Sequence, residues 1–179
     1  MKLSRNQLIN LSTFLLLTLA GCNSEPKKDD TTKTYAIEEL MAAANELDRM
    51  YLEAFNNGDV EGLMRLHWDH PELRTYPPGE MQIKGWHDVK NSYIKDFSAN
   101  KGAKLEYTST YNIPFADGVA GFGTYRWVMP VEGGSPIVIE GRYTDVKAYK
   151  DGKMLIIHDH SSVPMAPPPA DEVKVDTIE

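Results

Sequence analysis

The chain has 179 residues with a formal net charge of −7, and 41% of its residues are hydrophobic. A chain of this length forms one domain with a sizeable core. The acidic balance argues against binding to nucleic acid and against polybasic attachment to anionic lipids, because both require a surplus of Lys and Arg.

The first 21 residues have the pattern of an export signal. Lys2 and Arg5 precede an apolar run over residues 8–20, which is too short for a transmembrane helix of about 20 apolar residues. The sequence LAGC, which ends at the only cysteine, Cys22, resembles a bacterial lipobox, whose cysteine is lipidated after cleavage. We therefore expect a lipoprotein of the bacterial cell envelope, held on a membrane through Cys22 and facing the periplasm or the cell exterior. A plain secretory signal with an incidental cysteine is the alternative.

The remaining chain divides into three parts by composition. Residues 22–36 are polar and charged without an apolar period, which predicts a flexible tether. Residues 166–179 form a proline-rich acidic tail, so the predicted domain covers residues 37–165. Loss of residues 1–21 removes two basic residues and no acidic ones, and brings the net charge to −9.

The first part of this domain has helical patterns. Apolar residues recur at spacings of three and four from Ile37, and Asn57-Gly58 predicts the end of this helix. Asp59 is placed to cap a second, short helix. A third helix is predicted over about residues 86–97, and prolines between the second and third helices predict loops with a short strand or hairpin near residues 73–84.

After Lys101-Gly102 the pattern alternates with period two, which is typical of strands. Four long segments, residues 103–117, 119–131, 135–149 and 153–164, are separated by DG, GG and KDG turn sequences. This order predicts an α+β fold in which three N-terminal helices pack on a strongly curved antiparallel sheet.

Two stretches carry a resemblance to a known superfamily. ELDRMYLEAFNNGDVEGLMRLHWDHPEL and YTDVKAYKDGKMLIIHDHSS are similar to SnoaL-like and ketosteroid-isomerase-like domains of the nuclear transport factor 2-like superfamily. The resemblance implies a cone-shaped domain with an apolar pocket between the helices and the sheet. It is a marker of fold more than of activity, because unrelated functions share this scaffold.

The resemblance to ketosteroid isomerases implies roles for two residues. Tyr51 stands eight residues before Asp59, at the spacing of the isomerase tyrosine, and Asp145 matches the oxyanion-hole acid if one gap is allowed. The position of the isomerase base holds Tyr76, which is not a carboxylate. Steroid isomerisation is therefore disfavoured, because the usual proton acceptor is missing.

The final strand contains His158 and His160, separated by one aspartate. Simple alternation predicts that both share a face with Met154 and Ile156 and form a polar end of the pocket wall, where a histidine could act as acid or base. The alternative, which we favour, is that they are hydrogen-bonded residues at the sheet end or at a dimer face.

Several aromatic side chains are further candidates for ligand binding, although they could instead pack in the core. Arg142 could supply a cation to the pocket. No cofactor and no metal site is predicted, because nothing in the sequence forces the histidines to converge. The aromatic candidates are Trp68, Tyr76, Trp86, Tyr107, Tyr125 and Trp127.

Three functional hypotheses follow. The first is a membrane-anchored domain, expected to be a homodimer, whose pocket binds a small hydrophobic or aromatic molecule without catalysis. The second is a SnoaL-like enzyme that uses Tyr51, Asp145, His158 and His160 for general acid–base chemistry on such a molecule. The third is a dimeric assembly module for a partner in the envelope.

Overall fold

The computed structural model describes residues 34–165. The predicted export signal, Cys22, most of the predicted tether and the acidic tail lie outside the described residues. Within residues 34–165, no helix combines the length and the apolar character needed to cross a membrane.

The described residues form three α-helices at the predicted places: α1 (Ile37–Asn57), α2 (Val60–Leu66) and α3 (Trp86–Ala99). Gly58 ends α1 in a left-handed conformation with φ of 66°, which glycine adopts without steric cost. The Asp59 side chain caps α2 by accepting a hydrogen bond of 2.8 Å from the Gly62 backbone N–H. Both predicted boundaries, the end of α1 and the start of α2, are confirmed. Each could be predicted because it depends on one or two neighbouring residues.

Six strands of this part of the chain form one sheet in the order β2-β1-β6-β5-β4-β3. The predicted antiparallel meander is confirmed, and the short β1 and β2 pair as a hairpin near the predicted place. β1 also pairs in parallel with β6. This pairing was not predicted, because β1 has only three residues and carries no pattern that specifies a partner strand. The strand bounds are β1 (Arg74–Tyr76), β2 (Ile83–Lys84), β3 (Lys104–Phe115), β4 (Gly118–Met129), β5 (Ile137–Lys150) and β6 (Lys153–Ser162).

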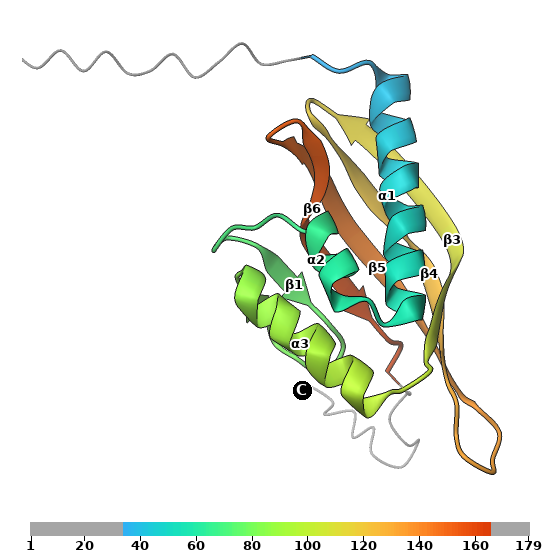
Figure 1. Cartoon of the computed structure of the whole chain (residues 1–179). Helices are drawn as coiled ribbons and strands as arrows, with labels where there is room; N and C mark the ends of the chain where they lie inside the picture. Colours follow the sequence, from blue (N-terminus) through green and yellow to red (C-terminus); the bar gives the residue numbers. More distant parts are fainter. Residues whose placement is uncertain (1–33, 166–179) are drawn as a thin grey trace, which may run out of the picture. The chain divides into compact units, whose positions relative to one another are not determined.

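The helices lie against the sheet (Figure 1). α1 packs mainly against β3 and also contacts β4, β6 and α2, whereas α3 packs against α2 and β2. One core cluster joins the helices around Leu63, Met64 and Val89. A second joins the first half of α1 to the sheet through Leu40, Ala44 and Val119. The space between α1, α3 and the sheet is the place where a pocket is expected.

A β-bulge in β6 decides which of its side chains face the helices. Val146 pairs with His158, but the next residue of β5, Lys147, pairs with Ile156, so Ile157 is an extra residue in β6. Such an insertion reverses the alternation of side chains beyond it. The prediction that His158 and His160 share the face of Met154 and Ile156 is therefore wrong, and Asp159 takes the inner face instead.

Candidate functional site

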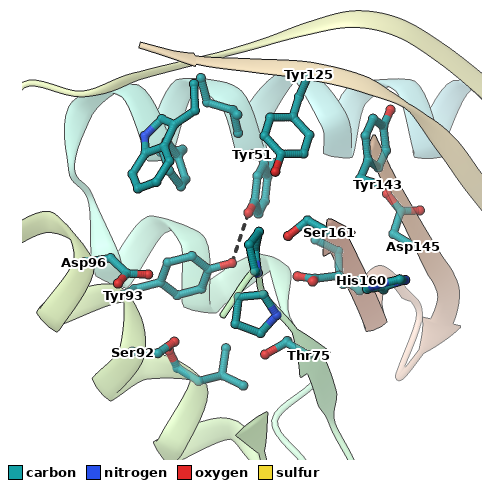
Figure 2. A pocket seen from close by; sticks show the side chains of 18 of the residues that line it. Tyr51, Thr75, Ser92, Tyr93, Asp96, Tyr125, Tyr143, Asp145, His160 and Ser161 are labelled. Atoms are coloured by element: carbon teal, nitrogen blue, oxygen red, sulfur yellow. Dashed lines mark hydrogen bonds between the residues drawn. The ribbon is translucent and has the colours of Figure 1, made fainter. Parts of the chain in front are cut away.

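A pocket of about 220 Å³ lies between α1, α3 and the inner face of the sheet (Figure 2). Because a cavity of about 150 Å³ admits benzene, this volume has room for a small molecule with one substituted ring. The aromatic residues of the wall are Tyr51, Phe55, Tyr93, Tyr107, Tyr125, Trp127 and Tyr143. Its polar residues include Thr75, Ser92, Asp96, Asp145, Asp159 and Ser161.

A chain of hydrogen bonds leads from the pocket into the helical layer. The hydroxyl oxygens of Tyr51 and Tyr93 are 3.1 Å apart and form a hydrogen bond, drawn as a dashed line in Figure 2. The Tyr93 hydroxyl lies 3.5 Å from His67 Nε2. His67 Nδ1 is 2.8 Å from the Leu63 carbonyl oxygen. Burial lowers the pKa of His67 to about 4, so the ring is neutral at physiological pH.

A buried cation stands between two carboxylates beside the pocket. The Lys147 side chain is fully buried, and its Nζ lies 2.7 Å from Asp48 Oδ1 and 3.0 Å from Asp145 Oδ1. Gly121 on β4 makes room for this group, because a Cβ at this position would lie 2.8 Å from Lys147 Nζ and would overlap the Asp145 carboxylate. The ion pairs thus connect α1 to β5 at the pocket wall.

Two carboxyl groups, Asp145 and Asp159, stand opposite each other on neighbouring strands of the inner face. Burial raises the pKa of Asp145, and the positive charge of Lys147 opposes this rise. Burial, with the negative charge of Asp145 as a second cause, raises the pKa of Asp159 to about 7. Near neutral pH, Asp159 therefore exchanges between a neutral acid that donates a hydrogen bond and a charged base.

One hydrogen-bond donor at the pocket lacks a partner. The indole nitrogen of Trp127 is buried, and it has no hydrogen-bond acceptor among the described residues. A buried N–H without an acceptor costs free energy. An acceptor atom on a bound molecule would remove this cost.

The structure brings five of the predicted site residues to the pocket wall: Tyr51, Tyr107, Tyr125, Trp127 and Asp145. His160 borders the pocket and also an open hollow on the outer face, which Arg142 lines as well. Arg142 donates a hydrogen bond of 3.2 Å to Ser162 Oγ in this outer region.

The other predicted residues do not line this pocket. Tyr76 and His158 pack against each other with ring centroids 5.5 Å apart, on the side of the strands opposite Thr75 and Asp159. Trp68 stacks on His70 at 3.7 Å. Trp86 packs against the helical core and donates a hydrogen bond of 3.2 Å to the Met64 carbonyl oxygen.

Five residues that determine the charges and hydrogen bonds of this site were not predicted as site residues: Asp48, His67, Tyr93, Lys147 and Asp159. Asp48 and Lys147 are charged residues, which are normally expected at the surface, so a hydrophobic pattern does not indicate their burial. Simple alternation along β6 predicts that Asp159 faces away from the helices, because it takes no account of the bulge at Ile157. Tyr93 lies in the predicted third helix, and His67 is one of the histidines that the sequence did not force to converge.

Comparisons with known proteins identify the fold. No protein-family model matches the chain, and no curated protein sequence is significantly similar to it. A nuclear transport factor 2-like superfamily protein from Salmonella enterica serovar Typhimurium is similar in structure, with a TM-score of 0.66 at 18% identity over 76% of this chain and 99% of that chain.

Two further solved structures support the same assignment. A protein from Streptomyces avermitilis, described as a dehydratase of the nuclear transport factor 2-like family, has a TM-score of 0.66 at 16% identity over 72% of this chain and 99% of that one. A protein from Xanthomonas campestris, described as a calcium/calmodulin-dependent protein kinase II association domain, has a TM-score of 0.59 at 21% identity over 68% of this chain and 85% of that one. At these identities the likeness shows the nuclear transport factor 2-like fold alone, as the resemblance in the sequence implied.

Replacement of the buried cation tests its role. We expect Lys147→Met to lower the free energy of unfolding by about 3–5 kcal/mol at neutral pH, because it leaves two buried carboxylates without their cation. The loss should be smaller at lower pH, because burial raises the pKa of Asp145 and protonation removes its buried charge. Urea unfolding at neutral pH and at lower pH measures it, with the exposed Lys101→Met as control. If Lys147→Met and Lys101→Met had equally small effects, Lys147 would not stabilise the fold by neutralising the two carboxylates.

Replacement of Asp159 by its neutral isostere tests the raised pKa. Because the pKa of Asp159 is raised from 3.8 to about 7, the folded state loses stability as pH rises through this range and the carboxyl group ionises. Asp159→Asn removes this loss, so its free energy of unfolding should equal that of wild type near pH 4 and exceed it by about 4 kcal/mol above pH 8. Denaturation at a series of pH values measures the difference, with the exposed Asp69→Asn as control. A difference that does not depend on pH would show that Asp159 ionises normally.

Proposed function

We propose that this domain binds a small molecule with an aromatic or other apolar ring, and that Tyr51, Asp145 and Asp159 hold the polar group of this molecule. The observation that carries the proposal is the convergence of these three residues and a largely aromatic wall on one cavity of about 220 Å³. Ligand pockets combine an apolar wall with a few polar groups that fix orientation. The nuclear transport factor 2-like fold is compatible with such a pocket.

A second candidate function is general acid–base catalysis on the bound molecule. It is favoured by Asp159, because a catalytic group works best when its pKa lies near the working pH, and burial brings the pKa of Asp159 to about 7. Tyr51 and Asp145 line the same pocket, whereas His160 stands at its border. The similarity in fold to a protein described as a dehydratase is compatible with this candidate.

We also propose that the domain is a homodimer, as expected from the sequence. Support comes from apolar side chains on the outer face of the sheet, where Tyr111, Ile113 and Phe122 are 61%, 56% and 37% exposed. The rings of Tyr111 and Phe122 stack with centroids 5.6 Å apart, so the two side chains form one continuous apolar patch. Exposed apolar groups of this kind are typical of protein interfaces.

Attachment to a membrane of the bacterial cell envelope is a further proposal, supported by the sequence of residues 1–22 alone. The lipid on Cys22 would hold the protein at the membrane, with residues 23–36 as the tether of the domain. A pocket placed in this way would meet small molecules in the periplasm or at the cell exterior.

Native mass spectrometry of the full chain tests the pocket and the oligomeric state together. We expect a dimer that carries a copurified small molecule, which denaturation then releases for identification. Ser92→Trp on α3 should abolish this extra mass, because the larger ring fills the cavity. Ser98→Trp is the matched control, since it places the same ring on the exposed part of the same helix.

The possible outcomes separate the hypotheses. A dimer without bound mass would favour the assembly module, and a monomer without bound mass would contradict both the pocket and the dimer. If wild-type protein converts the released molecule, loss of turnover with retained binding in Asp159→Asn would support catalysis.

Replacement of Cys22 tests the anchor. We expect wild-type protein in the membrane fraction and Cys22→Ser in the soluble fraction, because serine cannot form the thioether to the lipid. Ser24→Ala, two residues away, should stay in the membrane fraction. Retention of Cys22→Ser in the membrane would contradict lipid attachment at this residue.

A further inference from the structure

The ring of His67 has a defined arrangement of hydrogens. Its Nδ1 lies 2.8 Å from the carbonyl oxygen of Leu63, and a carbonyl oxygen only accepts hydrogen bonds, so Nδ1 carries the hydrogen. The side chain is 2% exposed, and burial lowers its pKa to about 4. A neutral ring has one N–H, and Nε2 is therefore an acceptor.

This acceptor sets the direction of both tyrosine hydroxyls. Tyr93 is the partner of His67 Nε2 at 3.5 Å, so the Tyr93 hydroxyl donates its hydrogen to the ring. The Tyr93 oxygen then accepts from Tyr51, whose oxygen is 3.1 Å away. Both hydrogens point from the pocket towards the helical layer, and the Tyr51 oxygen presents its lone pairs to the cavity.

The carboxyl groups at the pocket complete this pattern. Asp145 lies 3.0 Å from the Lys147 ammonium, which favours its charged, accepting form. Asp159 is close enough to Tyr51 to affect it, since burial and then the negative charge of Asp159 raise the pKa of Tyr51. A group bound between Tyr51 and Asp159 thus meets an acceptor on one side and a carboxyl group that donates when protonated on the other.

We propose that the pocket selects a small ring-containing molecule that bears a hydroxyl group, such as a phenol, over one whose oxygen only accepts. A hydroxyl group can donate to Tyr51 and accept from Asp159 at the same time. An ether or carbonyl oxygen leaves the Tyr51 oxygen without a donor, which costs free energy in a buried site. This selectivity rests on the pocket-binding function proposed above and names the class of its ligand.

Three probes of equal heavy-atom count test the selectivity on the full chain. They are 4-ethylphenol, its isomer 4-methylanisole, and 4-methylbenzaldehyde, and calorimetry measures the Kd of each. We expect 4-ethylphenol to bind about tenfold more tightly than the other two. All three probes have an oxygen that can accept from Trp127, so this unpartnered donor does not produce the difference.

Two variants test whether the orientation of the Tyr51 hydroxyl causes the selectivity. His67→Phe removes the acceptor that orients Tyr93, and Tyr93→Phe removes the acceptor that orients Tyr51, so in either variant the Tyr51 hydrogen is free to turn into the cavity. The preference for 4-ethylphenol over 4-methylbenzaldehyde should fall by about tenfold in each. Tyr149→Phe, which removes a hydroxyl outside the pocket, should leave it unchanged.

The results distinguish this proposal from the one on which it rests. Equal binding of the three probes to wild type, or an unchanged preference in both folded variants, would overturn the selectivity and leave the pocket in place. If none of the probes binds, both proposals fail for molecules of this size.

Discussion

The arrangement of the pocket depends on the buried ammonium group of Lys147. It contacts Asp48 on α1 and Asp145 on β5, so one side chain fixes the helical layer against the sheet beside the cavity. Two carboxylates around one cation leave a net negative charge in the interior, and the charge of Asp145 contributes to the raised pKa of Asp159. Buried ion pairs are often no more stable than apolar replacements, so the effect of Lys147 on the charges of the pocket is independent of any net gain in stability.

The sequence predicted the features of the fold that depend on neighbouring residues. Gly58 ended α1, Asp59 capped α2, and the turn sequences separated the four long strands, each in the predicted place. The parallel pairing of β1 with β6 was not predicted. It joins residues more than 80 positions apart through a strand of three residues, and no local pattern of that length determines a partner.

The site was predicted in part, and the misses have a common physical cause. Tyr51 and Asp145 were found because a resemblance supplied their positions, and both line the pocket. Asp159 was missed because one extra residue, Ile157, reverses the faces of β6. A bulge without glycine or proline leaves no mark on a sequence read by alternation. Asp48 and Lys147 were missed because charged residues are expected at the surface unless their partners are known.

The chemical states of the pocket groups are set by residues that do not line it. His67 is not part of the wall, yet its accepting nitrogen turns the hydroxyl hydrogens of Tyr93 and Tyr51 away from the cavity. Lys147 is not part of the wall either, yet its positive charge opposes the rise that burial causes in the pKa of Asp145, which stands beside Asp159. A tyrosine that accepts and a carboxyl group that exchanges its proton near neutral pH form a different site from the oxyanion hole that the resemblance to isomerases implied for Tyr51 and Asp145. Matching the residues that touch the ligand therefore does not transfer a mechanism, because the groups behind them determine where the protons are.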